Sequence, residues 1–271
     1  MRELLGSAVV TMADLGASHE WTLHRAELAD GRKVFVKRAD GPGGGFQAEA
    51  AGLRWLAEAG AAPVPEVLAA DDRILVLPWL ETGAPSARDA ERFGRELAAL
   101  HLHGAPAYGA PWQGFIAELP LDNTGDDDWP AFYARRRLVP FLRDLDPVGV
   151  RLVERVIESL GELAGPAEPP SRIHGDLWSG NVLWSGGRGW LIDPAAHGGH
   201  RETDLAMLAL FGVPHLDRII AAYDEAAPLA PGWRDRVPLH QLHPLLVHVT
   251  LYGGTYHQAV ARAAQDALRA R

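Results

Sequence analysis

Hydrophobic and polar residues alternate most clearly near the N-terminus of the chain. Residues 21–28 (WTLHRAEL) and 33–38 (KVFVKR) are rich in aromatic and β-branched residues, and they flank Asp30-Gly31, a dipeptide suited to a tight hairpin turn. The apolar run at 73–80 (RILVLPWL) is typical of a buried strand that ends at Pro78. The pattern predicts a small sheet, built on a hairpin, within the first 80 residues.

A helix is predicted between the second and third of these strands. Phe46, Glu49, Leu53 and Leu56 are spaced so that they share one helical face. Glu49 is the polar member of this apolar stripe, and a carboxylate there is costly unless it is paired. The nearest lysine is Lys37, at the end of the preceding strand, so we expect a Lys37–Glu49 ion pair; the alternative is that Glu49 points off the stripe into solvent.

From residue 86 onward the chain is predicted to be mostly helical. Apolar residues at helical spacing between 90 and 100 mark an amphipathic helix that Ser86 and Asp89 can cap. The segment before it (ETGAPS) is typical of a hinge. We therefore predict an α+β fold with a small N-terminal lobe, residues 1–80, and a larger helical lobe, residues 81–271. Ligands tend to bind at such junctions.

Composition narrows the class of protein. The 271 residues include 35 acidic and 26 basic side chains, and the net charge of −9 argues against binding to a nucleic-acid backbone. The chain has no cysteine, which excludes disulfides and thiolate chemistry. No apolar run approaches the roughly 18 residues that span a bilayer, and the N-terminus lacks the pattern of a signal peptide. We expect a cytoplasmic protein with a small substrate and no membrane partner.

Histidines and aromatic residues offer weaker signals. Three histidine pairs match no zinc pattern, so we expect capping, core or surface roles for them; they are His101-x-His103, His197-x-x-His200 and His240-x-x-His243. The residues Trp129, Phe132 and Tyr133 have helical spacing and are expected in the core. The run 135–137 (RRR) is expected on a solvated helix face.

The densest candidate chemistry lies between residues 171 and 204. Asp176 follows His174-Gly175, Asn181 comes five residues later, and Asp193 ends the short apolar segment WLID. Two carboxylates and an amide suit a hard cation such as Mg²⁺. A carboxylate left free of metal could accept the proton of a hydroxyl group.

A predicted hairpin brings part of this set together. Two short strands, near 182–184 and 190–192, are joined by the segment SGGR. Because the strands of a hairpin are antiparallel, Asn181 and Asp193 are expected at the same end. The hairpin thus predicts a cation site of oxygen ligands.

These motifs resemble the catalytic and metal-binding elements of kinase-like phosphotransferases. HGD in place of HRD, and DPA in place of DFG, are similar to the small-molecule branch that includes aminoglycoside phosphotransferases and choline kinases. More closely, HGDLWSGN followed by IDPAAHGGHRETDLAMLALFG resembles the fructosamine (ketosamine) 3-kinase family. Further stretches, among them FVK with FQAEAAGLRWL, and LYGGTY, extend the resemblance over nearly the whole chain.

The resemblance implies a protein-kinase-like two-lobed fold and the cofactors ATP and Mg²⁺. It implies phosphorylation of the 3-hydroxyl of a ketosamine (a fructosamine, ribulosamine or erythrulosamine), free or on a protein lysine, as the first step of deglycation. The alternatives are a kinase for another hydroxylated amine, such as an aminoglycoside or choline, and a nucleotide-binding regulator without catalysis. The oligomeric state stays open, and a monomer is compatible with the sequence.

Residue roles follow from the resemblance. It makes Asp176 the catalytic base, Asn181 and Asp193 the magnesium ligands, and Lys37 a contact of the α- and β-phosphates that is paired with Glu49. The phosphate-covering loop, LGASHEW, has one glycine where the family usually has a pair. The other implied residues are Gly16 in that loop; Leu77, Pro78, Trp79 and Leu80 in the adenine hinge; Trp178, His200, Arg201 and Glu202 at the substrate; and His174 and Asp204 as supports of the catalytic loop.

Overall fold

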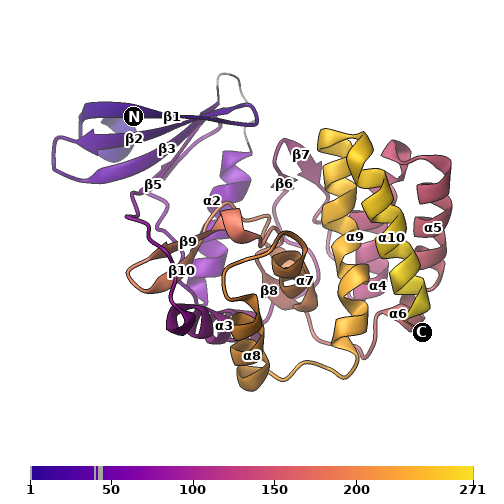
Figure 1. The fold of residues 1–271 in the computed structure, drawn as a ribbon. Helices are drawn as coiled ribbons and strands as arrows, with labels where there is room; N and C mark the ends of the chain where they lie inside the picture. Colours follow the sequence, from indigo (N-terminus) through magenta and orange to yellow (C-terminus); the bar gives the residue numbers. More distant parts are fainter. Residues whose placement is uncertain (1, 40, 42–44, 271) are drawn as a thin grey trace.

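The N-terminal part of the protein is an antiparallel sheet with one long helix beside it (Figure 1). A computed structural model describes residues 2–39, 41 and 45–270. The five strands lie in the order β1-β2-β3-β5-β4. The elements of this part are α1 (Arg2–Leu5), β1 (Val9–Ser18), β2 (Trp21–Leu28), β3 (Lys33–Ala39), α2 (Phe46–Glu58), β4 (Ala69–Ala70) and β5 (Ile74–Pro78).

The hairpin predicted around Asp30-Gly31 is confirmed, since β2 and β3 pair across it. Gly31 has φ +85°, a left-handed conformation that glycine adopts without steric cost, and Asp30 accepts the backbone N–H of Arg32. The expected loop before β2 is shorter than the sequence suggested, because β1 continues to Ser18. This strand lies at the edge of the sheet and is almost entirely exposed, so it lacks the alternation that marks a half-buried strand.

The helix α2 connects the two parts of the molecule. It packs under the sheet through Phe46 and Leu53, whereas Leu56, closer to its C-terminal end, belongs to a buried cluster of the helical part. A Cβ added to Gly52 would lie only 3.2 Å from the Cβ of Ala196, so α2 runs close against the segment that follows β10 (Arg188–Leu191). The predicted apolar stripe is confirmed.

The remainder of the chain is mostly helical, and residues 79–86 connect it to the sheet. The Ser86/Asp89 capping box forms as expected at the start of α3. The elements are α3 (Ala87–Leu102), β6 (Gly114–Ile116), β7 (Leu119–Leu121), α4 (Trp129–Phe132), the π-helical η1 (Tyr133–Leu138), the 3₁₀ segments η2 (Val139–Asp144), η3 (Ser179–Asn181) and η4 (Gly254–Tyr256), α5 (Pro147–Glu158), α6 (Leu160–Leu163), β8 (Ser171–Ile173), β9 (Val182–Ser185), β10 (Arg188–Leu191), β11 (His197–Gly199), α7 (Glu202–Phe211), α8 (Leu216–Ala226), α9 (Trp233–Tyr252) and α10 (His257–Arg269).

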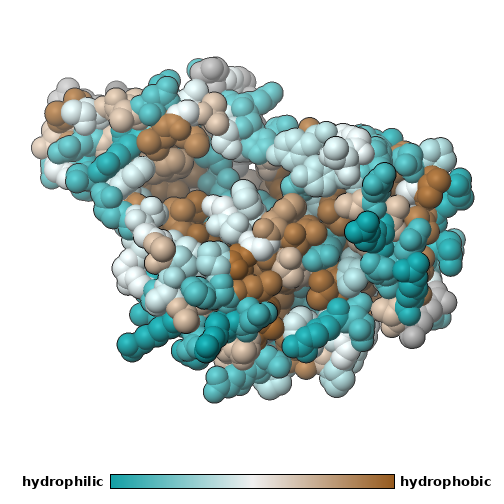
Figure 2. Space-filling view, viewed as in Figure 1, coloured by the Kyte–Doolittle hydropathy of each residue, from teal (hydrophilic) through white to brown (hydrophobic). Residues whose placement is uncertain are grey.

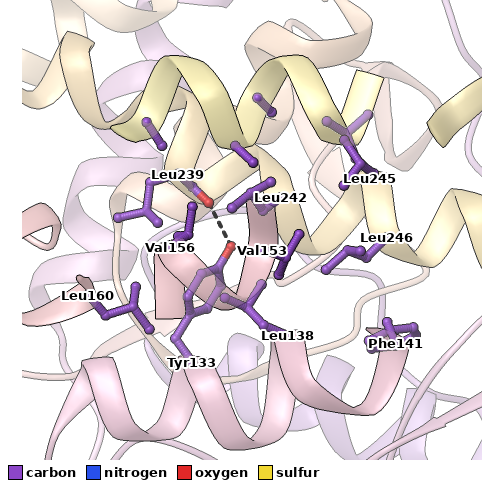
Figure 3. Close-up of a cluster of buried hydrophobic side chains, with 14 of the residues drawn as sticks. Tyr133, Leu138, Phe141, Val153, Val156, Leu160, Leu239, Leu242, Leu245 and Leu246 are labelled. Atoms are coloured by element: carbon purple, nitrogen blue, oxygen red, sulfur yellow. Dashed lines mark hydrogen bonds between the residues drawn. The ribbon is translucent and has the colours of Figure 1, made fainter. Parts of the chain in front are cut away.

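The core of the helical part forms where α9 and α10 pack against α5 and the π-helical segment (Figure 3). Trp129, Phe132 and Tyr133 are buried there, as expected. The Tyr133 hydroxyl donates to the Leu239 carbonyl (2.8 Å) and accepts the N–H of His243 (3.2 Å), so it is inserted into the hydrogen-bond ladder of α9. Such insertions bend helices, and this one fixes α9 against the π-helical segment.

Two further findings concern one buried arginine and the character of the helices. The expectation of a solvated face for 135–137 is wrong for Arg137, which is buried and donates to the side chain of Asn123 and the carbonyl of Asp122. Among the described helices, none combines the length and the apolar character that crossing a membrane requires.

Candidate functional site

A cleft of about 790 Å³ lies between the sheet and the helical part. Figure 2 shows hydrophobic side chains gathered in the hollow between these parts. Both lobes line the cleft, and its side chains differ from one end to the other. The apolar end, which suits a flat ring, is lined by Leu23, Phe35, Leu77, Pro78, Trp79, Leu80, Leu183 and Ile192.

At the polar end of the cleft, Lys37 joins the two lobes. Its Nζ lies 2.9 Å from Oε2 of Glu49 and 2.9 Å from Oδ1 of Asp193, which confirms the expected pairing with Glu49. Nζ also lies 4.0 Å from the centre of the Trp21 ring. Burial disfavours the ammonium form, but the carboxylates of Asp193 and Glu49 outweigh burial and raise the pKa of Lys37. Lys37 therefore stays charged.

The predicted hairpin of β9 and β10 forms and brings the candidate ligands together. The Asn181 carbonyl accepts the N–H of Ile192 (3.1 Å), which places Asn181 next to Asp193. Nδ2 of Asn181 donates to the carbonyl and to Oδ2 of Asp176 (2.8 and 3.0 Å), so its Oδ1 is the atom left to bind a cation. Asp176, Asn181 and Asp193 thus line one end of the cleft.

The carboxylates of this end carry unequal pKa shifts. Burial, together with the negative charge of Asp193, raises the pKa of Asp176 to about 7. The same two causes raise the pKa of Glu49 to about 7. Asp193 is opposed by burial too, but the Lys37 ammonium outweighs burial and lowers its pKa. The pKa values of Asp176 and Glu49 both suit proton transfer near neutral pH, but Glu49 is bound to Lys37 (2.9 Å), so Asp176 is the carboxylate left for that task.

The donor set at this end fits a divalent cation. Three carboxylates, those of Glu49, Asp176 and Asp193, face one ammonium group, that of Lys37, so negative charge is in excess. The available ligand atoms are oxygens, which Mg²⁺ prefers. Asp193 has φ +52°, a left-handed conformation that is uncommon outside glycine, although aspartate enters it more readily than most residues. Strain of this kind is common where a side chain must be aimed.

The segment that carries Asp176 is held from below by Asp204. The carboxylate of Asp204 accepts the backbone N–H groups of His174 (2.7 Å) and Gly175 (2.9 Å). His174 accepts the Asp176 N–H at Nδ1 and donates from Nε2 to the Ile192 carbonyl (2.9 Å), and burial lowers its pKa. Both residues therefore hold the backbone of the segment that carries Asp176.

His101, for which the sequence indicated no specific role, also belongs to this support. Its Nε2 donates to Asp204 (3.0 Å), and its Nδ1 accepts the Tyr223 hydroxyl (2.8 Å). It is 1% exposed on the apolar face of α3. A histidine on a stripe that is otherwise apolar was the available signal, as Glu49 was on α2.

The residues expected at the substrate are only partly brought together. Trp178 lines the cleft and is 39% exposed. His200, Arg201 and Glu202 do not line it. Arg201 donates twice to Glu168 (2.7 and 2.7 Å), and Arg236 donates twice to Glu202 (2.9 and 2.6 Å). The side chains of these three residues pack within the helical lobe and not along the cleft, so the structure does not bring them to the site beside Trp178.

Aromatic residues that the sequence analysis left without a role form a wall beside Trp178. Ring centres lie 6.2 Å apart for Trp178 and Phe211, 4.8 Å for Phe211 and His248, and 4.9 Å for His248 and Tyr256. Tyr252 adjoins His248 at 5.4 Å. All five line the cleft. The LYGGTY stretch held the two tyrosines, but sequence alone could not show which way they face.

The segment that the resemblance predicts to cover the phosphates is a strand followed by a turn. Gly16 has φ +99° at an irregularity in the β1–β2 pairing and does not line the cleft. Its neighbours Leu15, Ser18 and His19 do.

Comparison with known proteins places this geometry in context. A family model described as fructosamine kinase matches residues 15–270. A probable ketoamine kinase of Thermus thermophilus is 37% identical over 238 residues, which cover 86% of each chain. The crystal structure of a putative fructosamine-3-kinase from Thermobifida fusca is 55% identical with a TM-score of 0.96, covering 99% of this chain and 96% of that one.

A more distant structure shows how widely the fold extends. A macrolide 2′-phosphotransferase from Brachybacterium faecium is 17% identical, with a TM-score of 0.64, and the match covers 97% of this chain and 98% of that one. The protein-kinase-like α+β fold expected from the motifs is thereby confirmed.

Proposed function

This chain belongs to the fructosamine kinase family and is therefore an ATP-dependent phosphotransferase, and we propose that it phosphorylates the 3-hydroxyl of a ketosamine, the first step of deglycation. The observation that carries the proposal is the cluster of Lys37, Asp176, Asn181 and Asp193 at one end of the cleft, beside an aromatic wall. Because ATP is the donor, we place the reaction in the cytoplasm, and we propose that a monomer suffices since one chain supplies every part.

In the proposed mechanism Asp176 is the catalytic base. Its carboxylate orients the acceptor hydroxyl and takes its proton as the phosphoryl group arrives, and a pKa of about 7 suits this exchange at neutral pH. The Asn181 amide fixes the carboxylate through the 3.0 Å hydrogen bond to Oδ2. Phosphoryl transfer has a loose transition state, so positioning and neutralisation of charge provide most of the rate.

Lys37 is proposed to hold the phosphates. Its ammonium is fixed by Glu49 from behind, and the group that it gives up when the phosphates bind is Asp193. Asn181 and Asp193 are the proposed magnesium ligands, and the ion, when bound, neutralises charge on the phosphate oxygens. The excess of carboxylates over cations at this end of the cleft supports the assignment.

The apolar end is proposed to take adenine. Within the hinge, Pro78 has no N–H group, and Trp79 already donates its own to the Lys33 carbonyl (3.0 Å). Leu80 is therefore the member of residues 78–80 whose N–H is proposed to meet the base. Leu23 and Ile192 line the cleft at this end and are proposed to cover the faces of the ring.

The acceptor is proposed to lie between Asp176 and the aromatic wall. Trp178 is placed to stack on the sugar, because aromatic rings pack well against the apolar face of a sugar. The ketosamine nitrogen is a cation at neutral pH, and the exposed faces of Phe211 and Tyr252 can accept a cation. This combination favours a sugar that carries an amine.

A coupled assay of ADP release tests the proposal. We expect turnover with Mg²⁺, ATP and ribulosyl- or fructosyl-lysine, and a shift of the product's sugar signals that locates the phosphate at the 3-position by NMR. Kanamycin and choline are the comparators. Turnover of a comparator with none of the ketosamines would overturn the acceptor assignment and leave the class of reaction intact.

A further inference from the structure

The turn between β1 and β2 is held in an unusual conformation. In Figure 1 it lies at the end of the sheet that faces β6, β7 and α9. His19, the first residue of the turn, has φ +54°. The left-handed region is costly for a residue other than glycine, although histidine enters it more readily than most. Such a conformation persists where surrounding contacts enforce it.

The contacts that enforce it come from the other lobe. Nδ1 of His19 lies 3.2 Å from Oε2 of Glu118, which is in the turn between β6 and β7. The His19 ring lies 6.4 Å from the ring of Tyr252, at the end of α9. Ala117, next to Glu118, has φ +50°. Two turns with left-handed residues thus meet across the mouth of the cleft.

The ring of Trp21 connects this turn to Lys37, the lysine proposed to bind the phosphates. His19 and Trp21 have ring centres 5.5 Å apart, and the Trp21 ring in turn lies 4.0 Å from Nζ of Lys37. Trp21 also packs on Phe46 at the start of α2 (5.8 Å). A shift of the turn away from Glu118 would therefore move the ring that covers Lys37.

We propose that His19 is a positioning residue: by binding Glu118 and packing on Tyr252, it holds the β1–β2 turn over the phosphate end of the cleft. A phosphate-covering loop with two glycines can close by bending its backbone around the phosphates. This loop has Gly16 alone, which does not line the cleft, so a side-chain contact between lobes takes over that task. The proposal rests on ATP-dependent phosphotransfer in this cleft and not on which acceptor is used.

The competing explanation is an ordinary surface ion pair without effect. The side chains of His19 and Glu118 are 25% and 41% exposed, and pairs in such positions often contribute nothing measurable. The two explanations differ in what they predict for nucleotide affinity, because only a positioning contact connects the pair to Lys37.

Charge exchange distinguishes them. His19→Asp keeps a residue that tolerates the left-handed conformation but sets two carboxylates against each other. Glu118→Gln removes the charge without changing shape, and the double variant His19→Asp/Glu118→Lys restores an opposite pair. Glu20→Gln, a change at the exposed neighbour of His19 in the same turn, is the matched control. The dissociation constant of a non-hydrolysable Mg²⁺–ATP analogue is measured by calorimetry, with the melting temperature as a check of folding.

We expect His19→Asp to weaken nucleotide binding about 5-fold and Glu118→Gln about 2- to 3-fold, and the double variant to return to within about 2-fold of the unmodified protein. Glu20→Gln is expected to bind normally. Unchanged affinity in Glu118→Gln, or a double variant that binds the nucleotide no better than His19→Asp alone, would overturn the proposal. If His19→Asp fails to fold, Glu118→Gln decides. If the variants change nucleotide affinity as expected but the protein phosphorylates no ketosamine, the result would contradict only the proposed acceptor.

Discussion

Among the residues that the structure describes, two of the buried clusters of charged groups balance charge in opposite ways. In the first, Lys37 is the single cation among Glu49, Asp193 and the nearby Asp176. In the second, Glu202 is matched by the guanidinium of a single arginine, which donates to both of its oxygens. The first cluster opens to the cleft, whereas the second is enclosed by α7 and α9.

The pKa values of the carboxyl groups differ between the two clusters in the same sense. Burial opposes ionisation of Glu202, but the neighbouring His240 and the two hydrogen bonds from Arg236 outweigh burial and lower its pKa to about 2. Burial and the charge of Asp193 raise the pKa of Asp176 to about 7. A cluster whose charges are matched needs nothing further and serves as scaffold. A cluster with excess carboxylates can bind further cations. Here these are proposed to be Mg²⁺ and the protons that are exchanged during catalysis.

The comparison also bears on the histidines. Ligand atoms of His200, Glu202 and His240 lie within 4.8 Å of one another, close enough to suggest a metal site. Arg236 already neutralises the carboxylate, and a divalent ion would have to bind beside its guanidinium. Burial and the neighbouring His240 lower the pKa of His200 to about 3, so its ring stays neutral. A structural network accounts for this cluster without a metal.

The largest effect is expected from Asp176→Asn. The amide keeps the shape of the carboxyl group but cannot take the hydroxyl proton, so turnover should fall by about 10³-fold or more. Nucleotide affinity should stay nearly unchanged, because Lys37 and the hinge are untouched. The ADP-release assay and calorimetry measure the two quantities, and turnover like that of the unmodified protein would show that the base is elsewhere.

Asp193→Asn is expected to lower turnover by about 100-fold and to weaken its dependence on magnesium. The amide is a poorer ligand for Mg²⁺, and it also removes one of the two ion pairs of Lys37. A titration of activity with Mg²⁺ measures both effects. An unchanged half-saturating concentration of Mg²⁺ would remove Asp193 from the proposed ligand set.

Glu202→Gln and Glu49→Gln form a matched pair that sharpens the comparison. Glu202→Gln leaves the buried Arg236 without a counter-charge and should lower the free energy of unfolding by about 3–5 kcal/mol. In Glu49→Gln, Lys37 keeps Asp193 as a partner, so the expected loss of stability is smaller, while nucleotide binding weakens. Urea denaturation and calorimetry provide the readouts; the reverse order of stabilities would contradict the division into scaffold and site.

A change of one pH unit is expected to alter activity less than either aspartate substitution. Asp176 must be ionised to act as a base, and its pKa is raised to about 7, so activity should fall as the pH drops below about 7, by about tenfold per unit. A bound Mg²⁺ disfavours protonation nearby, so higher magnesium should move this limb to lower pH.

The stability profile should behave differently. The pKa of Glu202 in the folded protein is lowered to about 2 from an ordinary value of 4.5. Its contribution to stability is therefore complete above pH 4.5 and is lost as the pH falls toward 2. Circular dichroism measured beside activity should show folded, inactive protein near pH 5. Unfolding that coincides with the loss of activity would contradict this separation.

The sequence by itself determined the local elements and the order of the proposed catalytic groups. The Asp30-Gly31 turn and the Ser86/Asp89 cap depend only on residues a few positions apart, so the sequence predicts both of them. The Lys37–Glu49 pair joins adjacent elements, and the misplaced carboxylate on α2 revealed it. The edge strand β1 escaped prediction because exposure on both faces removes the alternation of residue types.

Only the tertiary structure decided which distant residues meet. Lys37 pairs with Asp193 across 156 positions, and His101 supports Asp204 across 103. His200, Arg201 and Glu202 look like substrate contacts in sequence, since a motif does not say which way its side chains face; packing turned them toward α9 and Glu168. The aromatic wall and the contact of His19 with Glu118 likewise depend on how the lobes are docked. The hydrophobic effect that drives this docking is non-directional, so it does not specify in the sequence which distant groups will meet.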